Sequence, residues 1–174
     1  MAQMGSLIAP GARLAQMYAE RLLKGVTQAT YARLARPGGT VIQSNHAAFV
    51  LGHLALYPAR VLQFLNLPPE PVAAPAQFTA LFKDGVACQD DSDGKIYPPL
   101  DELSSVFFSG YKSAIDAIAA APDERFTGPN PAEGRMRELF PTLGSALNFY
   151  VLGHVEMHLG QLSAWRRAMG LPPA

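Results

Sequence analysis

Interruptions of helical periodicity divide this chain into four segments, each long enough to form a helix. Apolar residues recur at intervals of three and four within them, as in helices that bury one face. Proline and glycine lie between the segments, where a helix has to end. No segment shows the alternation of apolar and polar residues that is typical of a strand. The four predicted helices cover residues 11–33, 45–65, 99–121 and 141–169, and the sequence therefore predicts an all-α fold.

The links between these helices differ in length. The link at residues 66–98 is long enough to cross a whole helical bundle, which allows the second and third helices to run parallel, and FTALFKD (78–84) within it predicts a short helix. The link at 122–140 is predicted to cover one open end of the bundle. Pro58 lies inside the second predicted helix. It either kinks that helix just beyond His53 or ends it early, and both interpretations stay open.

Charge and cysteine content exclude several classes of protein. Fourteen basic residues balance fourteen acidic ones, so no electrostatic field attracts nucleic acid or an anionic membrane. The apolar segment 47–65 is interrupted by a histidine, a proline and an arginine, which argues against a membrane span. A single cysteine, Cys88, and the lack of a signal-peptide pattern fit a reducing compartment. We expect one soluble cytoplasmic domain spanning residues 1–174.

The acidic segment QDDSDG (89–94) superficially resembles a calcium-binding loop. It lacks the closing glutamate at the required spacing, so the sequence predicts a solvated turn. Cys88 precedes this segment, and the neighbouring carboxylates are expected to raise the pKa of its thiol. We therefore expect an unreactive cysteine.

Two histidines near the C-terminus, in HVEMHLGQLSAW (154–165), are the first candidate metal ligands. His154 and His158 are four residues apart, so they project from one helix face, one turn apart, at a spacing that lets two imidazoles reach one ion. Glu156 points to the opposite side, which argues against an HExxH protease site. The alternative is that the pair consists of two polar residues that happen to share a face.

His53 is the candidate third ligand because it lies among apolar residues in VLGHLAL. An unpaired polar group in such a setting is costly, so this imidazole should be hydrogen-bonded or metal-bound. His46 shares its face but lies about 10 Å away along the helix axis, which places it at the helix start or rim. Metal sites in bundles are often built from facing helices. Structural histidines remain the alternative.

Two segments, SNHAAFVLGHLALYP (44–58) and HVEMHLGQLSAWRRAMGLP (154–172), resemble motifs of the DinB-like (DinB/YfiT-type) superfamily of four-helix-bundle metalloenzymes. The resemblance implies that His53, His154 and His158 bind a divalent metal ion, which is zinc, nickel, iron or manganese in that superfamily. It also implies an up-down-down-up bundle, frequently a homodimer. Members with known activity are often transferases or isomerases that use a low-molecular-weight thiol, and some are hydrolases.

Three further residues are candidates for contact with a ligand or a small-molecule substrate. Tyr150 lies one turn before His154, and it either contacts substrate or packs in the core. Gln161 lies one turn after His158, and it either orients that histidine or satisfies a backbone group. His46 is the third. The alternative to an enzyme is a non-catalytic bundle that dimerises or binds an apolar ligand, with the histidines as internal polar groups.

Overall fold

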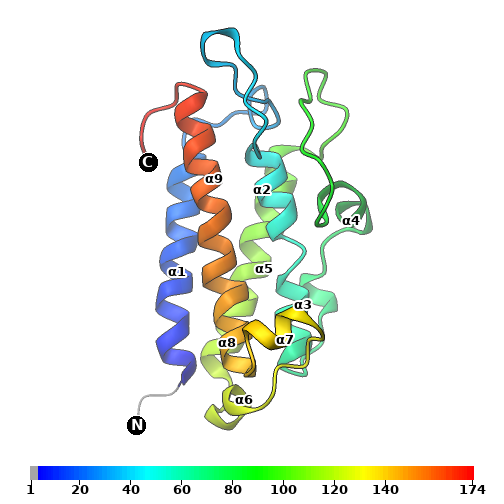
Figure 1. Cartoon of the computed structure of the whole chain (residues 1–174), viewed down its shortest axis with the longest axis vertical. Coiled ribbons are helices and arrows are strands. Elements are labelled where there is room, and N and C mark those ends of the chain that lie inside the picture. The colour runs from blue at the N-terminus through cyan, green and yellow to red at the C-terminus, as the bar shows by residue number, and fades with distance from the viewer. Residues whose placement is uncertain (1–3) are drawn as a thin grey trace.

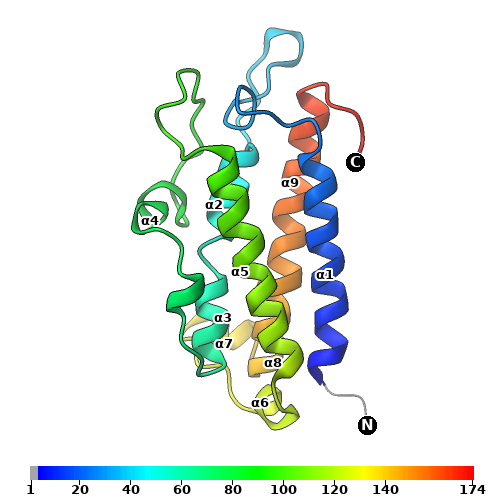
Figure 2. The same ribbon diagram turned by 180° about the vertical axis from the view of Figure 1, so that it is seen from behind.

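The computed structural model describes residues 4–174 and is all-helical. Long helices lie side by side along the long axis of the molecule, and shorter ones occupy the links (Figures 1 and 2). Among residues 4–174 no β-strand forms, and only an isolated bridge joins Pro129 and Thr142. The longer elements are α1 (Met4–Leu23), α2 (Ala47–Leu54), α3 (Pro58–Phe64), α5 (Leu100–Ala120) and α9 (His154–Ala168). The remaining elements are η1 (Pro37–Gly39), η2 (Glu70–Val72), α4 (Ala76–Phe82), α6 (Asp123–Thr127), α7 (Arg135–Leu139), α8 (Leu143–Asn148) and η3 (Phe149–Gly153). The predicted all-α class is confirmed.

The first helix spans Met4–Leu23, so it starts and ends earlier than the predicted 11–33. Its buried face carries glycine and alanine, which lets α5 and α9 approach closely. A Cβ atom on Gly5 would lie 2.2 Å from the Ile118 carbonyl oxygen. The helix ends before Gly25, whose φ of +80° belongs to the left-handed region that favours glycine. This glycine was not predicted as a stop signal.

Tyr31 follows α1 and connects the starts of two other helices. Its carbonyl oxygen accepts the Ala48 N–H at 3.0 Å, at the start of α2. Its hydroxyl donates to the Pro98 carbonyl oxygen at 2.9 Å, just before α5. The tyrosine side chain is buried, at 1% exposure. It therefore joins the first turn of α2 to the segment just before α5.

Pro58 divides the second predicted helix in two. α2 ends at Leu54, and α3 begins with Pro58 at its first position, where the missing N–H is tolerated. Of the two interpretations of this proline, the early end is the one observed. The window 47–64 has a mean hydropathy of 1.2 and is 67% buried within the molecule. Because a core helix also meets this criterion, the window is weak evidence for a membrane span.

The last predicted helix, 141–169, contains a π-helical turn that the sequence did not indicate. Thr142 caps α8 by accepting the Ser145 N–H at 3.2 Å. The turn η3 follows, and the N–H of His154 bonds to the Phe149 carbonyl oxygen, five residues back. Gly170 ends the helix with a φ of +75°, as predicted. Such π turns widen a helix by one residue and are frequent at functional sites.

The links contain more structure than expected. The predicted short helix at 78–84 is observed as α4. The 122–140 link carries α6 and α7, which were not predicted, and α6 lies against α8 and the start of α1 (Figure 1). The third predicted helix agrees closely with α5.

The segment 89–94 is only in part the solvated turn that the sequence predicted. Exposed residues in it are Gln89, Ser92, Asp93 and Gly94. Asp90 accepts hydrogen bonds from Arg33 Nε at 2.8 Å and from the Leu34 N–H at 2.8 Å. Asp91 is 5% exposed and accepts hydrogen bonds from the backbone N–H groups of Lys95, Ile96 and Tyr97. These two carboxylates anchor the long link, which the sequence did not indicate because the Asp90 partners lie more than fifty residues away.

Candidate metal centre

His53 lies in the last turn of α2 and is 6% exposed. Its Nδ1 atom lies 2.8 Å from the carbonyl oxygen of Phe82, the last residue of α4. Because a carbonyl oxygen only accepts, Nδ1 carries the hydrogen and donates it. The Nε2 atom of a neutral His53 is then left with a lone pair for another ligand.

His158 is oriented in the same way by a side chain of its own helix. Its Nδ1 atom donates to the Gln161 Oε1 at 3.0 Å. The same oxygen accepts a hydrogen bond from Asn45 Nδ2 at 2.9 Å, so a residue just before α2 fixes the amide. The Nε2 atom of His158 therefore also presents a lone pair. Two roles were predicted for Gln161, and its hydrogen bond to His158 fits the one in which it orients that histidine.

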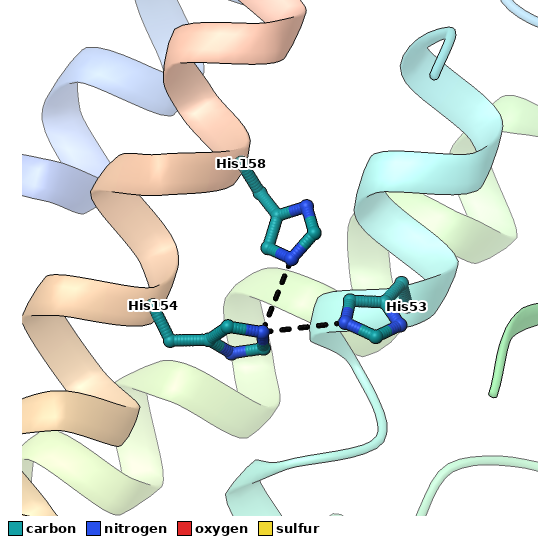
Figure 3. A group of neighbouring side chains, drawn as sticks. All are labelled: His53, His154 and His158. Carbon is teal, nitrogen blue, oxygen red and sulfur yellow. Dashed lines mark hydrogen bonds between the residues drawn. The ribbon is translucent and has the colours of Figure 1, made fainter. Parts of the chain in front are cut away.

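The three imidazoles meet between α2 and α9 (Figure 3). The Nε2 atom of His154 lies 3.3 Å from that of His53 and 3.1 Å from that of His158. One nitrogen from each ring lies within 4.8 Å of the other two. The sequence singled out these three histidines, and the fold brings them together from positions about a hundred residues apart.

The hydrogens available to this cluster are few. The Tyr57 hydroxyl lies 3.4 Å from His53 Nε2, and a neutral His154 has one N–H, which satisfies at most one of its two neighbours. Its Nδ1 atom is also buried with no hydrogen-bond partner among the described residues. A cation between the rings would interact with all three lone pairs, and imidazole nitrogen suits zinc, iron and nickel. The donor set therefore fits a divalent metal ion.

The protonation state points in the same direction. Burial, together with the nearby rings of His158 and His53, lowers the pKa of His154 to about 3. Burial and the neighbouring His53 also lower the pKa of His158. His154 is therefore neutral near pH 7, and neutral imidazole is the form that binds metal ions.

The cluster opens into a cavity of about 860 Å³. Besides the three histidines, its walls include Tyr57, Arg60 and Tyr150. Its other lining residues are Asn45, Phe49, Leu56, Thr79, Lys83, Asp84, Gly85, Val86, Met136, Phe149 and Met157. The volume is in the usual range for small-molecule sites.

Two tyrosines flank the cluster. The Tyr57 hydroxyl lies 3.4 Å from His53 Nε2, and its ring lies 4.5 Å from that of His154 between centroids. Tyr150 is 2% exposed, stacks on Tyr57 at 5.6 Å, and accepts a hydrogen bond from Arg60 at 3.2 Å. It both packs in the core and lines the cavity. Tyr57 was not predicted as a site residue, although it lies four residues after His53, and neither was Arg60.

His46 and Glu156 lie outside the cavity. His46 is the N-cap of α2, fully buried, with Nδ1 accepting the Phe49 N–H and Nε2 donating to the Gln89 carbonyl oxygen at 2.8 Å. The expectation of a helix-start residue is met, and His46 does not line the cavity. Glu156 is exposed to solvent, as predicted.

No protein-family model matches the chain, and no curated protein matches it. Its class therefore comes from fold and site alone. The chain forms an all-helical protein with a cluster of three histidines that could hold a metal ion at the wall of a cavity.

Proposed function

We propose that this protein is a metal-dependent enzyme of the DinB-like type, acting on a small molecule in the cytoplasm. His53, His154 and His158 bind one divalent cation, which is zinc, nickel, iron or manganese. The observation that carries the proposal is the convergence of three imidazole nitrogens within 4.8 Å at the wall of an 860 Å³ cavity. The reaction class is transferase, isomerase or hydrolase, and a low-molecular-weight thiol is a candidate co-substrate.

The proposal includes an up-down-down-up four-helix bundle, made of α1, α2 with α3, α5, and α8 with α9. Two observations support it. Tyr31 bonds to the first turn of α2 and to Pro98, just before α5, as expected if these helices run parallel. Gly5, near the start of α1, packs against Ile118, near the end of α5, as expected if α1 and α5 run antiparallel.

The chemistry of such a site follows from its ligands. A divalent cation held by three imidazoles keeps coordination positions for other molecules and supplies Lewis-acid activation of a water molecule or a thiol. The Phe82 carbonyl and the Gln161 amide hold His53 and His158 in the tautomers with Nε2 unprotonated. Tyr57 places a hydroxyl beside the cluster, where it can donate to a substrate oxygen.

A homodimer is part of the proposal. Three apolar side chains on α1 are largely exposed, with Leu7 at 72%, Leu14 at 59% and Met17 at 60%. Their spacing places them on one helix face, which a second copy could cover. Size-exclusion chromatography with light scattering should give twice the chain mass. A monomer at micromolar concentration would contradict this part of the proposal.

Metal analysis of untagged protein tests the central claim. We expect about one divalent ion per chain in the wild type, and a large loss in His53→Ala and in His158→Ala. The matched control is His46→Asn, which removes a histidine outside the cluster and keeps a side chain suited to cap α2. It should retain the metal. Low metal content in the wild type, unchanged in the two cluster variants, would favour the non-catalytic bundle with structural histidines.

A further inference from the structure

Arg60 is held in a defined position on the cavity wall. Its Cζ atom lies 5.6 Å from the ring centroid of Tyr57 and 5.7 Å from that of Tyr150. Its Nη1 atom donates to the Tyr150 hydroxyl at 3.2 Å. A guanidinium placed over two aromatic faces and bonded to a phenol loses much of its freedom before any ligand arrives.

This guanidinium lacks an acidic partner among the described residues. The ion pairs in residues 4–174 involve Arg13, Arg33, Arg36 and Lys112. Of the five N–H groups of Arg60, the one toward Tyr150 has a protein acceptor in that part of the chain. The Tyr150 hydroxyl accepts from Arg60, so its own hydrogen is available to a ligand. The wall therefore offers a fixed cation and a phenol donor side by side.

The donor pair lies close to the three histidines. Tyr57 lies between them, since its ring is stacked on that of Tyr150 at 5.6 Å and lies 4.5 Å from the ring of His154. Lys83 adds a second positive charge to the cavity and Asp84 a negative one. The apolar part of the lining comprises Phe49, Leu56, Val86, Met136, Phe149 and Met157.

We propose that the substrate is a small organic acid. Its carboxylate binds Arg60 and the Tyr150 hydroxyl, its hydrocarbon body lies against the apolar lining, and its reacting part faces the histidines. A guanidinium fork matches a carboxylate with two parallel hydrogen bonds. This inference rests on the proposed function, because it assigns a substrate class to the same cavity.

Benzoate is a suitable probe because it combines a carboxylate with an aromatic ring, and benzamide is its neutral counterpart of nearly the same shape. Binding is measured by ligand-observed NMR at pH 8 with protein freed of metal by chelation, so that coordination to a metal ion does not contribute. We expect saturable binding of benzoate. Benzamide should bind about tenfold more weakly or worse, since charge-assisted hydrogen bonds are about twice as strong as neutral ones.

Variants of Arg60 locate the binding. Arg60→Met keeps the length of the side chain and should weaken benzoate binding about tenfold or more. Arg60→Lys keeps the charge without the fork and should fall between the two. The matched control is Arg21→Met, because Arg21 lies over Tyr18 at 5.5 Å, on α1 and outside the cavity. It should bind benzoate as the wild type does.

The inference would be overturned by no saturable binding of benzoate by the wild type, by equal binding of benzamide, or by unchanged binding by Arg60→Met. Inorganic phosphate that competes as strongly as benzoate would also overturn it, because the site would then select charge without the organic body. The metal content of the wild type and of Arg60→Met is measured on the purified proteins before chelation. A wild type that is purified without metal and binds benzoate would refute the metal proposal alone, whereas failed benzoate binding by a wild type that is purified with metal would refute only the substrate class.

Discussion

His53 Nδ1 and the Phe82 carbonyl oxygen lie 2.8 Å apart, although the two residues are separated by twenty-nine positions in the chain. This hydrogen bond joins the end of α4 to a candidate metal ligand on α2. Phe82 is fully buried, and the next four residues line the cavity. The long link thus orients His53 and forms part of the cavity wall beside it.

Replacing Gly52 should disturb this arrangement. A Cβ atom there would lie 2.4 Å from a ring carbon of Phe82, so Phe82 and its carbonyl would have to shift. We expect Gly52→Ala to lower the free energy of unfolding by about 2 kcal/mol, as for other overpacked cores. Metal affinity should fall about tenfold. Urea denaturation and metal titration measure the two effects.

Gly160→Ala is the matched control on α9. No atom lies within 4 Å of its added Cβ, and the position is exposed within a helix. Alanine should raise the free energy of unfolding there by up to about 1 kcal/mol. If Gly52→Ala were as stable as Gly160→Ala and kept its metal, the coupling between Phe82 and His53 would be refuted.

Gln161 should affect metal binding although it does not bind the metal. Gln161→Ala removes the acceptor of the His158 Nδ1–H, so the ring can rotate or change tautomer. We expect metal affinity to fall about tenfold with little change in the free energy of unfolding. Asn45→Ala should have the same effect but a smaller one, because Asn45 acts through Gln161. Isothermal titration with zinc provides the measurement.

Gln63→Ala serves as the comparison for Gln161, since Gln63 is an exposed glutamine on α3 outside the cavity. Its zinc affinity should equal that of the wild type. Equal affinity in Gln161→Ala as well would mean that the tautomer of His158 is set by other means.

Asp90 should make the free energy of unfolding depend on pH in the acid range. The Arg33 guanidinium, the Leu34 N–H and Arg36 hold the pKa of this carboxyl well below its usual range. Because the pKa is lower in the folded than in the unfolded state, the stabilisation is full above about pH 5. It is lost as pH falls below about 4 towards the folded-state pKa. Asp90→Asn should cost about 2 kcal/mol at neutral pH.

Denaturation of wild type and Asp90→Asn at pH 7, 5 and 3 tests this expectation. The difference between the two proteins should be equal at pH 7 and 5 and smaller at pH 3. Asp93→Asn, an exposed aspartate in the same link, should stay within about 0.5 kcal/mol of the wild type throughout. A difference for Asp90→Asn that grows in acid would contradict the sign of the shift.

Cys88 should react slowly in the folded protein. Burial, more than the neighbouring Asp90, raises the pKa of its thiol to about 11. Little thiolate is then present at pH 8, and the thiolate is the reactive form. We expect alkylation by iodoacetamide at pH 8 to be about tenfold slower or more than in urea. Equal rates in the two conditions would show that the thiol is free in solution.

The sequence anticipated the ends of helices best where the signal is local. Gly170 ends α9 as predicted, and Pro99 precedes α5, which was predicted nearly as observed. Pro58 was recognised as a break, but its two consequences were not distinguishable from the sequence. The outcome depends on packing. The Pro58 ring lies so close to Gly110 of α5 that a Cβ atom added to Gly110 would be 2.9 Å from the ring.

The π turn before His154 shows another limit on what can be predicted from the sequence. Residues 149–153 have no composition that separates a π turn from an α-helix, and the whole segment was predicted as one regular helix. The same limit applies to Arg60. Its position over two tyrosines depends on the new helix that begins at Pro58, and so it was not singled out.

The sequence by itself determined the all-helical class and the histidines worth considering, because helix periodicity and i,i+4 spacing follow from interactions between near neighbours in the chain. Only the tertiary structure decided how those histidines are oriented and brought together. It supplied Phe82 for His53, Asn45 for Gln161, and the approach of His53 to His154 across 101 residues. Such contacts depend on how helices and links cross in space, and no short-range pattern encodes that crossing.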